Sequence, residues 1–546
     1  MSQRVLAPAR PPALEEAVAG PTPDDVAIAA SARARPRVRA WWLWAAAAVL
    51  LLAGSAALVV WARTLPSFDA YGWLTWGQRT WHGGLDTNAA PSWKPLPYVF
   101  TAVYALVGHH AELRLWMTTS AAVGIAGAVF VGRLAYRLTA PPPGRAWTGW
   151  VAAAVAGLAL LLLRDELGYG YLHYVLSSQS DPMIVAFVLA AVELAWSGRP
   201  RAAFVCAVLA SLGRPEAWPL LALYSLWLWR EQPATRRLLV AGWFAVAALW
   251  FGIPALTSRT PFVSAANALD SGRAPSGDRV TAVISRFGSL QCWAVYVAAA
   301  LCVAGAAMRE WSARRTSSRE VWARRGAAAP HMSRTPDRVA LGLAAGIVVW
   351  VAIEVAFGLH GWPALGRYMF EPAAAATVLA GAFAGRALTA NWSTIASRLG
   401  SRIAGLEQRP GLAVAAVGPV LVALLIAALV PFAISSARQE RSDLTEQHAR
   451  TAEIEALPAA VDRLGGPATV RACGEPLTRL QYQSALAFAL GDNVSQVGFK
   501  YSQALAHGNP VLFVTPFPSG VGWQVQAAHQ TAPACRPLPT TPTTVS

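Results

Sequence analysis

Charged residues are scarce in this chain: Asp, Glu, Lys and Arg make up only 14% of its 546 residues, against about 25% in an average soluble domain. Apolar residues make up 55%. This composition excludes an assembly of soluble domains as the main architecture. The five cysteines show no metal-ligand spacing, and Cys473 and Cys535 are far apart and have no histidine partners at ligand spacing, which argues against a zinc site.

No nucleic-acid-recognition motif accompanies the net charge of +16. The arginines cluster in short stretches between apolar blocks, which is how charges that set membrane topology are distributed. A cleaved signal peptide is also a poor interpretation, because the first apolar block starts at residue 41 and is too long for one. We therefore expect no nucleic-acid partner and no signal peptide.

Long apolar runs are abundant, and several are close to the length that crosses a hydrocarbon layer of about 30 Å as a helix. They predict an all-α polytopic membrane protein with about 11 transmembrane helices. The expected spans are 41–62, 112–136, 147–164, 181–197, 201–213, 216–230, 238–256, 287–308, 339–358, 368–386 and 411–434.

Arginines fix the expected orientation in the cell membrane. Four of them directly precede the first span, so the N-terminus should be cytoplasmic, and alternate counting then places the arginine-rich loops inside. The C-terminal segment should lie outside. The predicted parts are a disordered tail 1–40, a transmembrane domain 41–436 with an outer loop 63–111, an extracytoplasmic domain 437–536 and a disordered tail 537–546.

Two apolar stretches are too short for simple spans. Pro95–Val107 would reach only about 20 Å as a helix, and we interpret it as an amphipathic or re-entrant helix on the outer face. The fifth and sixth spans are joined by Gly213-Arg214-Pro215-Glu216. We expect a helical pair whose bend lies within the outer leaflet.

The C-terminal segment has the pattern of a small α+β domain. It opens with a polar helix in which apolar residues recur at helical spacing: Leu457, Val461 and Leu464. Three short runs favour strands: 468–472, 494–499 and 511–515. Cys473 and Cys535 lie in this segment and would be able to form a disulfide outside the cell.

Ionisable residues at or near membrane depth are costly and usually functional. Under the predicted topology, such residues from separate regions meet at one level of the outer leaflet. Cations there would hold a lipid-linked sugar phosphate, and a carboxylate would accept the proton of an attacking hydroxyl. The candidate residues are Asp69, Asp86, Lys94, Asp181, Arg214, Glu216, Arg367 and Tyr368.

The order and spacing of these motifs over residues 41–390 resemble the GT-C superfamily of membrane glycosyltransferases. The closest pattern is that of the branch with protein O-mannosyltransferases and lipid A aminoarabinose transferases. The motifs are Ser67-Phe68-Asp69-Ala70-Tyr71, Trp93-Lys94-Pro95-Leu96-Pro97, Gly108, Glu112, Arg114-Leu115, Ser180-Asp181-Pro182, Gly213-Arg214-Pro215-Glu216 and Gly366-Arg367-Tyr368.

The resemblance implies an inverting, metal-independent hexosyltransferase that uses a polyprenyl-phosphate sugar as donor. Asp69 matches the family's catalytic carboxylate and Lys94 its phosphate-contacting lysine. Asp181 matches the second acidic position, and Arg367-Tyr368 the late Arg-Tyr pair. The chain departs from the family pattern where Ala70 replaces a glutamate and where Leu96 separates two prolines.

Other interpretations stay open at single residues. Asp86 suits either sugar hydroxyls or an ordinary turn, and Asp181 also suits a helix start. Arg214 and Glu216 would be able to pair with each other. His173 fits substrate contact or an aromatic belt at the membrane interface.

The sequence also leaves alternatives for the function. The acceptor is a cell-envelope glycan, a glycolipid or an exported protein, and the spread of aspartates would permit a divalent cation. A transporter or flippase of lipid-linked sugars is the alternative from another class. The replacement at Ala70 also leaves room for a non-catalytic scaffold.

Overall fold

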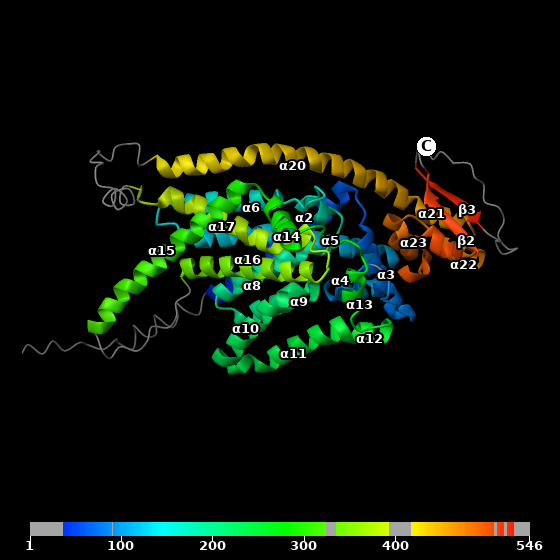
Figure 1. Ribbon diagram of the computed structural model, residues 1–546, viewed down its shortest axis with the longest axis horizontal. Helices are drawn as coiled ribbons and strands as arrows, with labels where there is room; N and C mark the ends of the chain where they lie inside the picture. Colours follow the sequence, from blue (N-terminus) through cyan, green and yellow to red (C-terminus); the bar gives the residue numbers. More distant parts are fainter. Residues whose placement is uncertain are drawn as a thin grey trace, which may run out of the picture. The chain divides into compact units, whose positions relative to one another are not determined.

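The computed structural model describes residues 36–89, 91–323, 335–392, 416–506, 510–517 and 521–528 (Figure 1). The chain divides into two compact units, Met1–Ala53 and Gly54–Ser546, and the second unit contains nearly all the elements discussed below. Helix α2 (Pro36–Ala62) already begins within the tail predicted for 1–40. The rest of that tail, the tail 537–546 and Cys535 lie outside the described residues.

Within the part of the chain that the structure describes, six helical stretches are long and apolar enough to cross a membrane, so the chain is a helical membrane protein. They are rich in Ala, Val and Leu. They are Trp42–Ala62, His109–Thr139, Pro233–Thr257, Trp293–Arg315, Pro336–Leu359 and Val417–Arg463. The corresponding elements are α2, α5 (His109–Thr139), α11 (Arg236–Ala247) with α12 (Ile253–Thr257), α15 (Trp293–Ala323), α16 (Pro336–Leu359) and α20 (Val417–Glu455).

The other five predicted spans coincide with helices, most of them shorter than the roughly 20 residues that a span needs. The count of about 11 spans therefore stays a prediction. These helices are α6 (Ala146–Leu161), α8 (Asp181–Trp196), α9 (Pro200–Gly213), α10 (Trp218–Glu231) and α17 (Phe370–Thr389).

Most residues of helix α17 are buried, and the helix packs against α5, α6 and α15. Its small residues allow this close packing, as is typical of helices in membranes. A Cβ atom at Gly381 would lie only 2.4 Å from the carbonyl oxygen of Ala152 in α6. Because α17 follows directly after Arg367 and Tyr368, its buried position fixes one side of the site.

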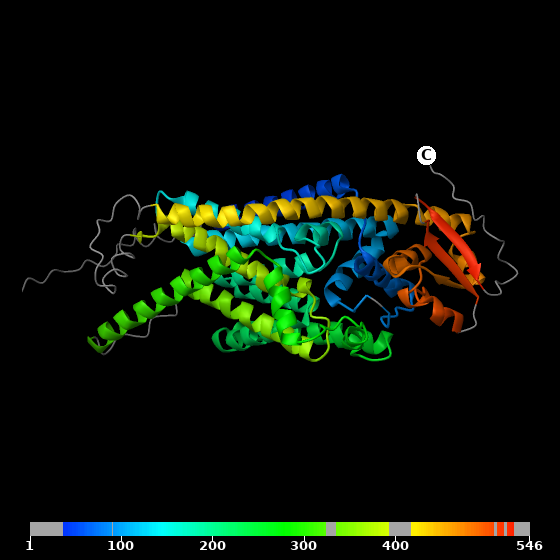
Figure 2. The same ribbon diagram turned by 45° about the horizontal axis from the view of Figure 1, so that its top comes forward.

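Two helix boundaries differ from the predictions. The expected span 287–308 is broken, because α14 (Arg279–Ser289) ends before α15 begins at Trp293. Between them, the Gln291 side chain accepts a hydrogen bond from the backbone of Cys292 and donates one to Ala159. The expected boundary at 436–437 falls inside α20, which packs against α17 along its first part and continues as one helix to Glu455 (Figures 1 and 2).

Both short apolar stretches form the expected helices. Pro95–Val107 consists of α4 (Pro95–Tyr104) and the 3-10 turn η1 (Ala105–Val107). Helix α9 ends at Gly213, and the turn η2 (Pro215–Ala217) leads into α10. Other short helices complete this part: α3 (Phe68–His82), α7 (Tyr171–Leu176), α13 (Val263–Leu269) and the turn η5 (Gly366–Met369).

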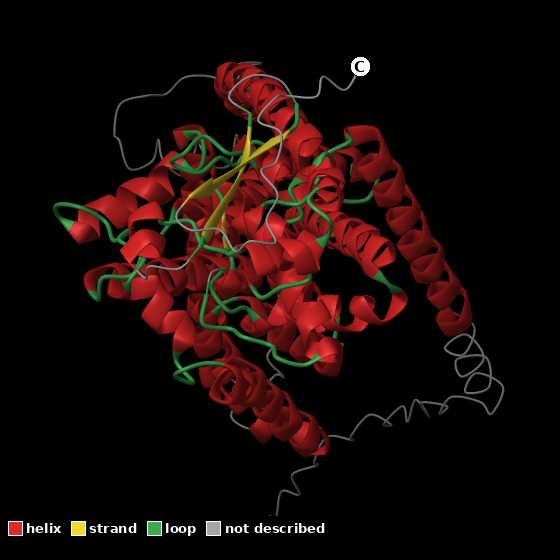
Figure 3. Ribbon diagram, turned by 90° about the vertical axis from the view of Figure 1, so that its right-hand side faces the viewer, coloured by secondary structure: helices red, strands yellow, loops and turns green. Residues whose placement is uncertain are grey.

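The C-terminal part contains a small mixed sheet, drawn in yellow in Figure 3. Strand β2 (Val511–Pro516) is central, with β1 (Glu475–Leu477) parallel to it and β3 (Trp523–Ala528) antiparallel. Helices accompany the sheet, which confirms an α+β arrangement: α21 (Leu457–Arg463), α22 (Pro467–Cys473), α23 (Gln483–Leu490) and α24 (Tyr501–Ala506).

Only the predicted strand 511–515 is confirmed. Residues 468–472 lie in α22 instead, because Pro467 fits the first turn of a helix and Gly474 follows its end. Val494–Gln496 forms the 3-10 turn η7, closed by a capping box between Asn493 and Gln496. Gly498 makes only an isolated β-bridge with Leu477. The predictions of strands at 468–472 and 494–499 are therefore wrong.

Candidate functional site

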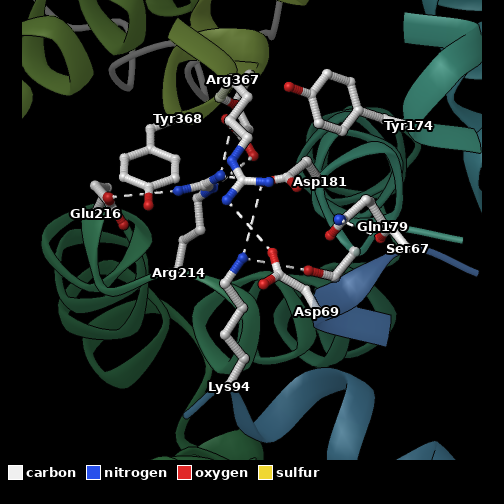
Figure 4. A network of polar contacts seen from close by, with 12 residues as sticks. Ser67, Asp69, Lys94, Tyr174, Gln179, Asp181, Arg214, Glu216, Arg367 and Tyr368 are labelled. Carbon is white, nitrogen blue, oxygen red and sulfur yellow. Dashed lines mark hydrogen bonds and ion pairs between the residues drawn. The ribbon is translucent and has the colours of Figure 1, made fainter. Parts of the chain in front are cut away.

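Seven of the eight predicted site residues lie together in one cluster of polar contacts (Figure 4). The chain reaches this cluster at the ends of helices. Asp69 is in the first turn of α3, Lys94 is at the N-cap of α4, and Asp181 opens α8. Both carboxylates therefore sit where a helix dipole favours negative charge. Arg214 ends α9 and Arg367 lies in η5.

Asp181 is the centre of the cluster and is fully buried. Its Oδ1 atom accepts a hydrogen bond from Arg214 and lies 3.9 Å from Lys94 Nζ. Arg214 also faces Glu216, with 3.8 Å between Nη1 and Oε1, and Glu371, with 3.5 Å between Nε and Oε1. A single buried guanidinium therefore compensates several carboxylates.

Asp69 and Arg367 form the second ion pair, with 3.4 Å between Oδ2 and Nη2. Burial alone would lower the pKa of Arg367, but Asp181 and Asp69 raise it well above its usual value. Arg214 joins the two pairs, because its Nη2 lies 3.5 Å from the carbonyl oxygen of Arg367 and its guanidinium lies 4.1 Å from the ring of Tyr368.

The loop before Arg367 is held by side chains that sequence reasoning missed. Arg286 Nη1 donates to the carbonyl oxygens of Pro363 and Ala364, at 2.6 and 2.9 Å. The backbone N–H of Gly366 donates to Glu166 Oε2 at 2.8 Å. A Cβ atom at residue 366 would lie 2.2 Å from that oxygen, so glycine permits this contact.

Two cavities lie beside the cluster. The larger, of 630 Å³, has mostly apolar and aromatic walls, and its polar lining residues include Lys94, Arg214, Glu216 and Tyr368. The smaller, of 220 Å³, has polar walls that include Arg367. Adjacent residues of η5, Arg367 and Tyr368, thus face different cavities. Asp69 lines neither, but it contacts Arg367.

Two buried glutamates were also missed. Glu371 contacts Arg214 and borders a third cavity, a mainly apolar one of 460 Å³. Glu354 lies in α16 and is fully buried. A sequence signal exists for both, because each interrupts an apolar run where a carboxylate is costly.

Asp86 is not part of the cluster. Its side chain accepts hydrogen bonds from the backbone and side chain of Asn88 and, at 2.6 Å, from Ser495 Oγ of the C-terminal part. Asn493 adds a 2.6 Å hydrogen bond to the carbonyl oxygen of Gly84. Asp86 therefore stabilises a turn and joins it to the C-terminal part, which matches the ordinary-turn interpretation.

We expect Asp86→Ala to destabilise the protein by about 1–2 kcal/mol, because Asn88 and Ser495 lose their acceptor. The measurement is thermal unfolding combined with limited proteolysis of the C-terminal part. Asp270→Ala, at an exposed aspartate, is the matched control. Unchanged stability and proteolysis in the Asp86 variant would contradict the structural role.

Within the described residues, no three His, Cys, Asp or Glu side chains are grouped so as to hold a metal ion. The prediction of metal-independent chemistry is not tested by this and stays a prediction.

No protein-family model matches the sequence, and no curated protein matches it. The resemblance to GT-C enzymes therefore rests on the motifs themselves.

Proposed function

We propose that this protein is an inverting glycosyltransferase of the GT-C type. It transfers a sugar from a polyprenyl-phosphate donor to a cell-envelope acceptor on the extracytoplasmic face of the membrane. The proposal includes about 11 transmembrane helices, a cytoplasmic N-terminus and a C-terminal domain outside the cell.

One observation carries the proposal. The buried ionic cluster stands beside a 630 Å³ apolar cavity on the Lys94 and Arg214 side and a 220 Å³ polar cavity on the Arg367 side. A lipid-linked sugar phosphate has the same succession of apolar chain, anionic group and polyhydroxylated ring. Ligand sites of this kind combine apolar walls with a few convergent polar groups.

The apolar cavity suits the first isoprene units of the donor, since its walls carry Trp93, Trp218, Trp250 and Phe357. Lys94 and Arg214 would then contact the phosphate. Burial lowers the pKa of Lys94, while Asp181 beside it acts in the opposite direction. An arriving phosphate would raise that pKa again and so favour the charged ammonium where it is needed.

In the proposed reaction, Asp69 accepts the proton of the acceptor hydroxyl as its oxygen attacks the anomeric carbon. The bond between that carbon and the phosphate oxygen breaks, and polyprenyl phosphate leaves with the electron pair. Lys94 and Arg214 stabilise the charge that develops on the leaving group. Arg367, 3.4 Å from Asp69, holds the carboxylate at the edge of the cluster by an ion pair.

Asp69→Asn tests the proposal, because it keeps the shape of the side chain and removes the proton acceptor. In nanodiscs supplied with polyprenyl-phosphate-linked hexoses and pentoses and an envelope-glycan extract, we expect release of free polyprenyl phosphate to fall at least about 100-fold. Donor binding and protein yield should stay close to those of the wild type.

Asp270→Asn, at an exposed aspartate outside the cluster, is the matched control and should release polyprenyl phosphate at the wild-type rate. Wild-type turnover in Asp69→Asn would remove Asp69 from the mechanism. Movement of intact donor across the membrane without release of polyprenyl phosphate would instead identify a transporter. Donor binding without either event would identify a scaffold.

A further inference from the structure

The long helix α20 carries a buried polar stripe that the proposed reaction does not use. Its members recur at helical spacing and lie on one face of the helix: Ser436, Asp443, Gln447 and Thr451. Polar side chains on the buried face of a helix are informative because they cost free energy unless they are partnered. Asp443 and Gln447 of this stripe contact His173, which lines the polar cavity beside Arg367.

His173 is the residue that joins this stripe to the cavity. Its Nδ1 atom lies 2.7 Å from Asp443 Oδ1, and Gln447 donates a 2.5 Å hydrogen bond to the other oxygen of Asp443. Because a carboxylate accepts, Nδ1 is the donor in this hydrogen bond, and Nε2 is the ring nitrogen left to contact a ligand. Among the described residues, Nε2 has no hydrogen-bond partner, and His173 lines the cavity.

Aromatic rings and polar groups alternate around the cavity. Tyr169 stacks on His173 with 4.3 Å between ring centroids, and Tyr174 lies edge-on to His173 at 5.2 Å. The cavity also contains Gln179, whose Oε1 atom is buried without a partner among the described residues. An aromatic surface next to unpaired hydrogen-bonding groups suits a sugar ring, which has an apolar face and hydroxyls at its edge.

The two acidic residues in the wall are already occupied. Asp165 accepts hydrogen bonds from the hydroxyl of Tyr174 and from the backbone of Leu167 and Tyr169. Glu166 accepts the backbone N–H of Gly366. Both therefore shape the cavity, and the polar groups that remain to contact a ligand are His173, Gln179, Arg273, Arg367 and Arg450.

We propose that this polar cavity binds the saccharide acceptor, and that His173, held in place by Asp443, determines which sugar is accepted. The inference rests on the proposed function, because a bound saccharide is an acceptor only if the protein transfers a sugar to it. It narrows the acceptor class to a glycan or glycolipid sugar. Arg367 places the cavity next to Asp69, so a hydroxyl bound there is close to the proposed base.

Saccharide binding without donor tests this inference separately from catalysis. Neutral methyl pyranosides and furanosides are offered to the full-length protein in nanodiscs, and saturation-transfer NMR measures their binding. We expect at least one glycoside to bind the wild type, and His173→Ala to raise its dissociation constant at least about tenfold. Asp443→Asn, which keeps the side-chain volume, should weaken binding less, and it serves as the folded variant if His173→Ala is unstable.

His360→Ala is the matched control, because His360 is exposed at the end of α16, and it should bind like the wild type. Equal binding by the wild type and the His173 and Asp443 variants would overturn the inference. So would the absence of binding by every glycoside, or displacement by inorganic phosphate alone, which would indicate an anion site. Saccharide binding with no release of polyprenyl phosphate would support the saccharide site in the polar cavity and contradict the proposed glycosyltransferase activity.

Discussion

Arg214→Ala is expected to destabilise the protein by about 3–5 kcal/mol and to abolish release of polyprenyl phosphate. Arg214 is 3% exposed, and its guanidinium faces Asp181, Glu216 and Glu371. Removing it leaves buried carboxylates without their shared cation, which is the costly way to break a buried ion pair. The measurement is the midpoint of thermal unfolding in detergent, together with donor binding.

Arg214→Lys tests whether the positive charge at residue 214 is sufficient or whether the planar guanidinium is also needed. An ammonium is a compact point charge and cannot bridge Asp181, Glu371 and the Arg367 carbonyl oxygen at once, so we expect partial recovery of stability but weak turnover. Arg201→Ala, at an exposed arginine at the start of α9, is the matched control and should unfold like the wild type. If Arg214→Ala unfolds at the wild-type midpoint, the cluster does not contribute to stability as argued.

The cluster was largely predictable because ionisable residues stand out in an apolar sequence. Asp69, Lys94, Asp181, Arg214 and Arg367 each occur at or beside the end of a helix, and charges near membrane depth persist only when they have partners. The sequence did not indicate which residues pair. The Asp69–Arg367 contact joins residues 298 positions apart, and that separation has no local signature.

Asp86 was among the predicted site residues because an outer-loop aspartate suits sugar hydroxyls, but an aspartate at that position suits an ordinary turn equally well. An aspartate followed by Thr87 and Asn88 favours a turn that its own side chain closes, and the structure has that hydrogen bond at 2.8 Å. Its second contact, with Ser495, lies 409 positions away and was not predictable from either end. Glu371 was not among the predicted site residues, although a carboxylate in such apolar surroundings indicates a charged partner.

The predictions of some helix ends and strands were wrong for local physical reasons. Hydropathy cannot distinguish one helix from two when the polarity of its surroundings changes, so the unbroken passage of α20 through residues 436–437 was missed. The same continuity builds the polar cavity, because Asp443 and Gln447 reach His173 from that helix. A short run such as 468–472 is compatible with either a strand or a helix. Here Pro467 at the helix start and Gly474 after its end favour the helix.

Gly77→Ala is the second large effect we expect, through geometry without any change of charge. A Cβ atom at residue 77 in α3 would lie 2.6 Å from both the carbonyl carbon and the oxygen of Thr101 in α4. Those are backbone atoms, so no side-chain rotation relieves the clash and the two helices must separate. Since α3 carries Asp69 and α4 begins after Lys94, the ionic cluster should be distorted.

We expect Gly77→Ala to cost about 1–3 kcal/mol of stability, as overpacking does, and to lower turnover about 100-fold, because a displacement near 1 Å suffices for such a loss. Gly157→Ala in α6 is the matched control, since nothing lies within 4 Å of its added methyl group. It should unfold and turn over like the wild type. If both variants keep wild-type turnover, the spacing of α3 and α4 does not set the position of Asp69 relative to Lys94. The proposed division between base and phosphate-binding residues would then lose its geometric support.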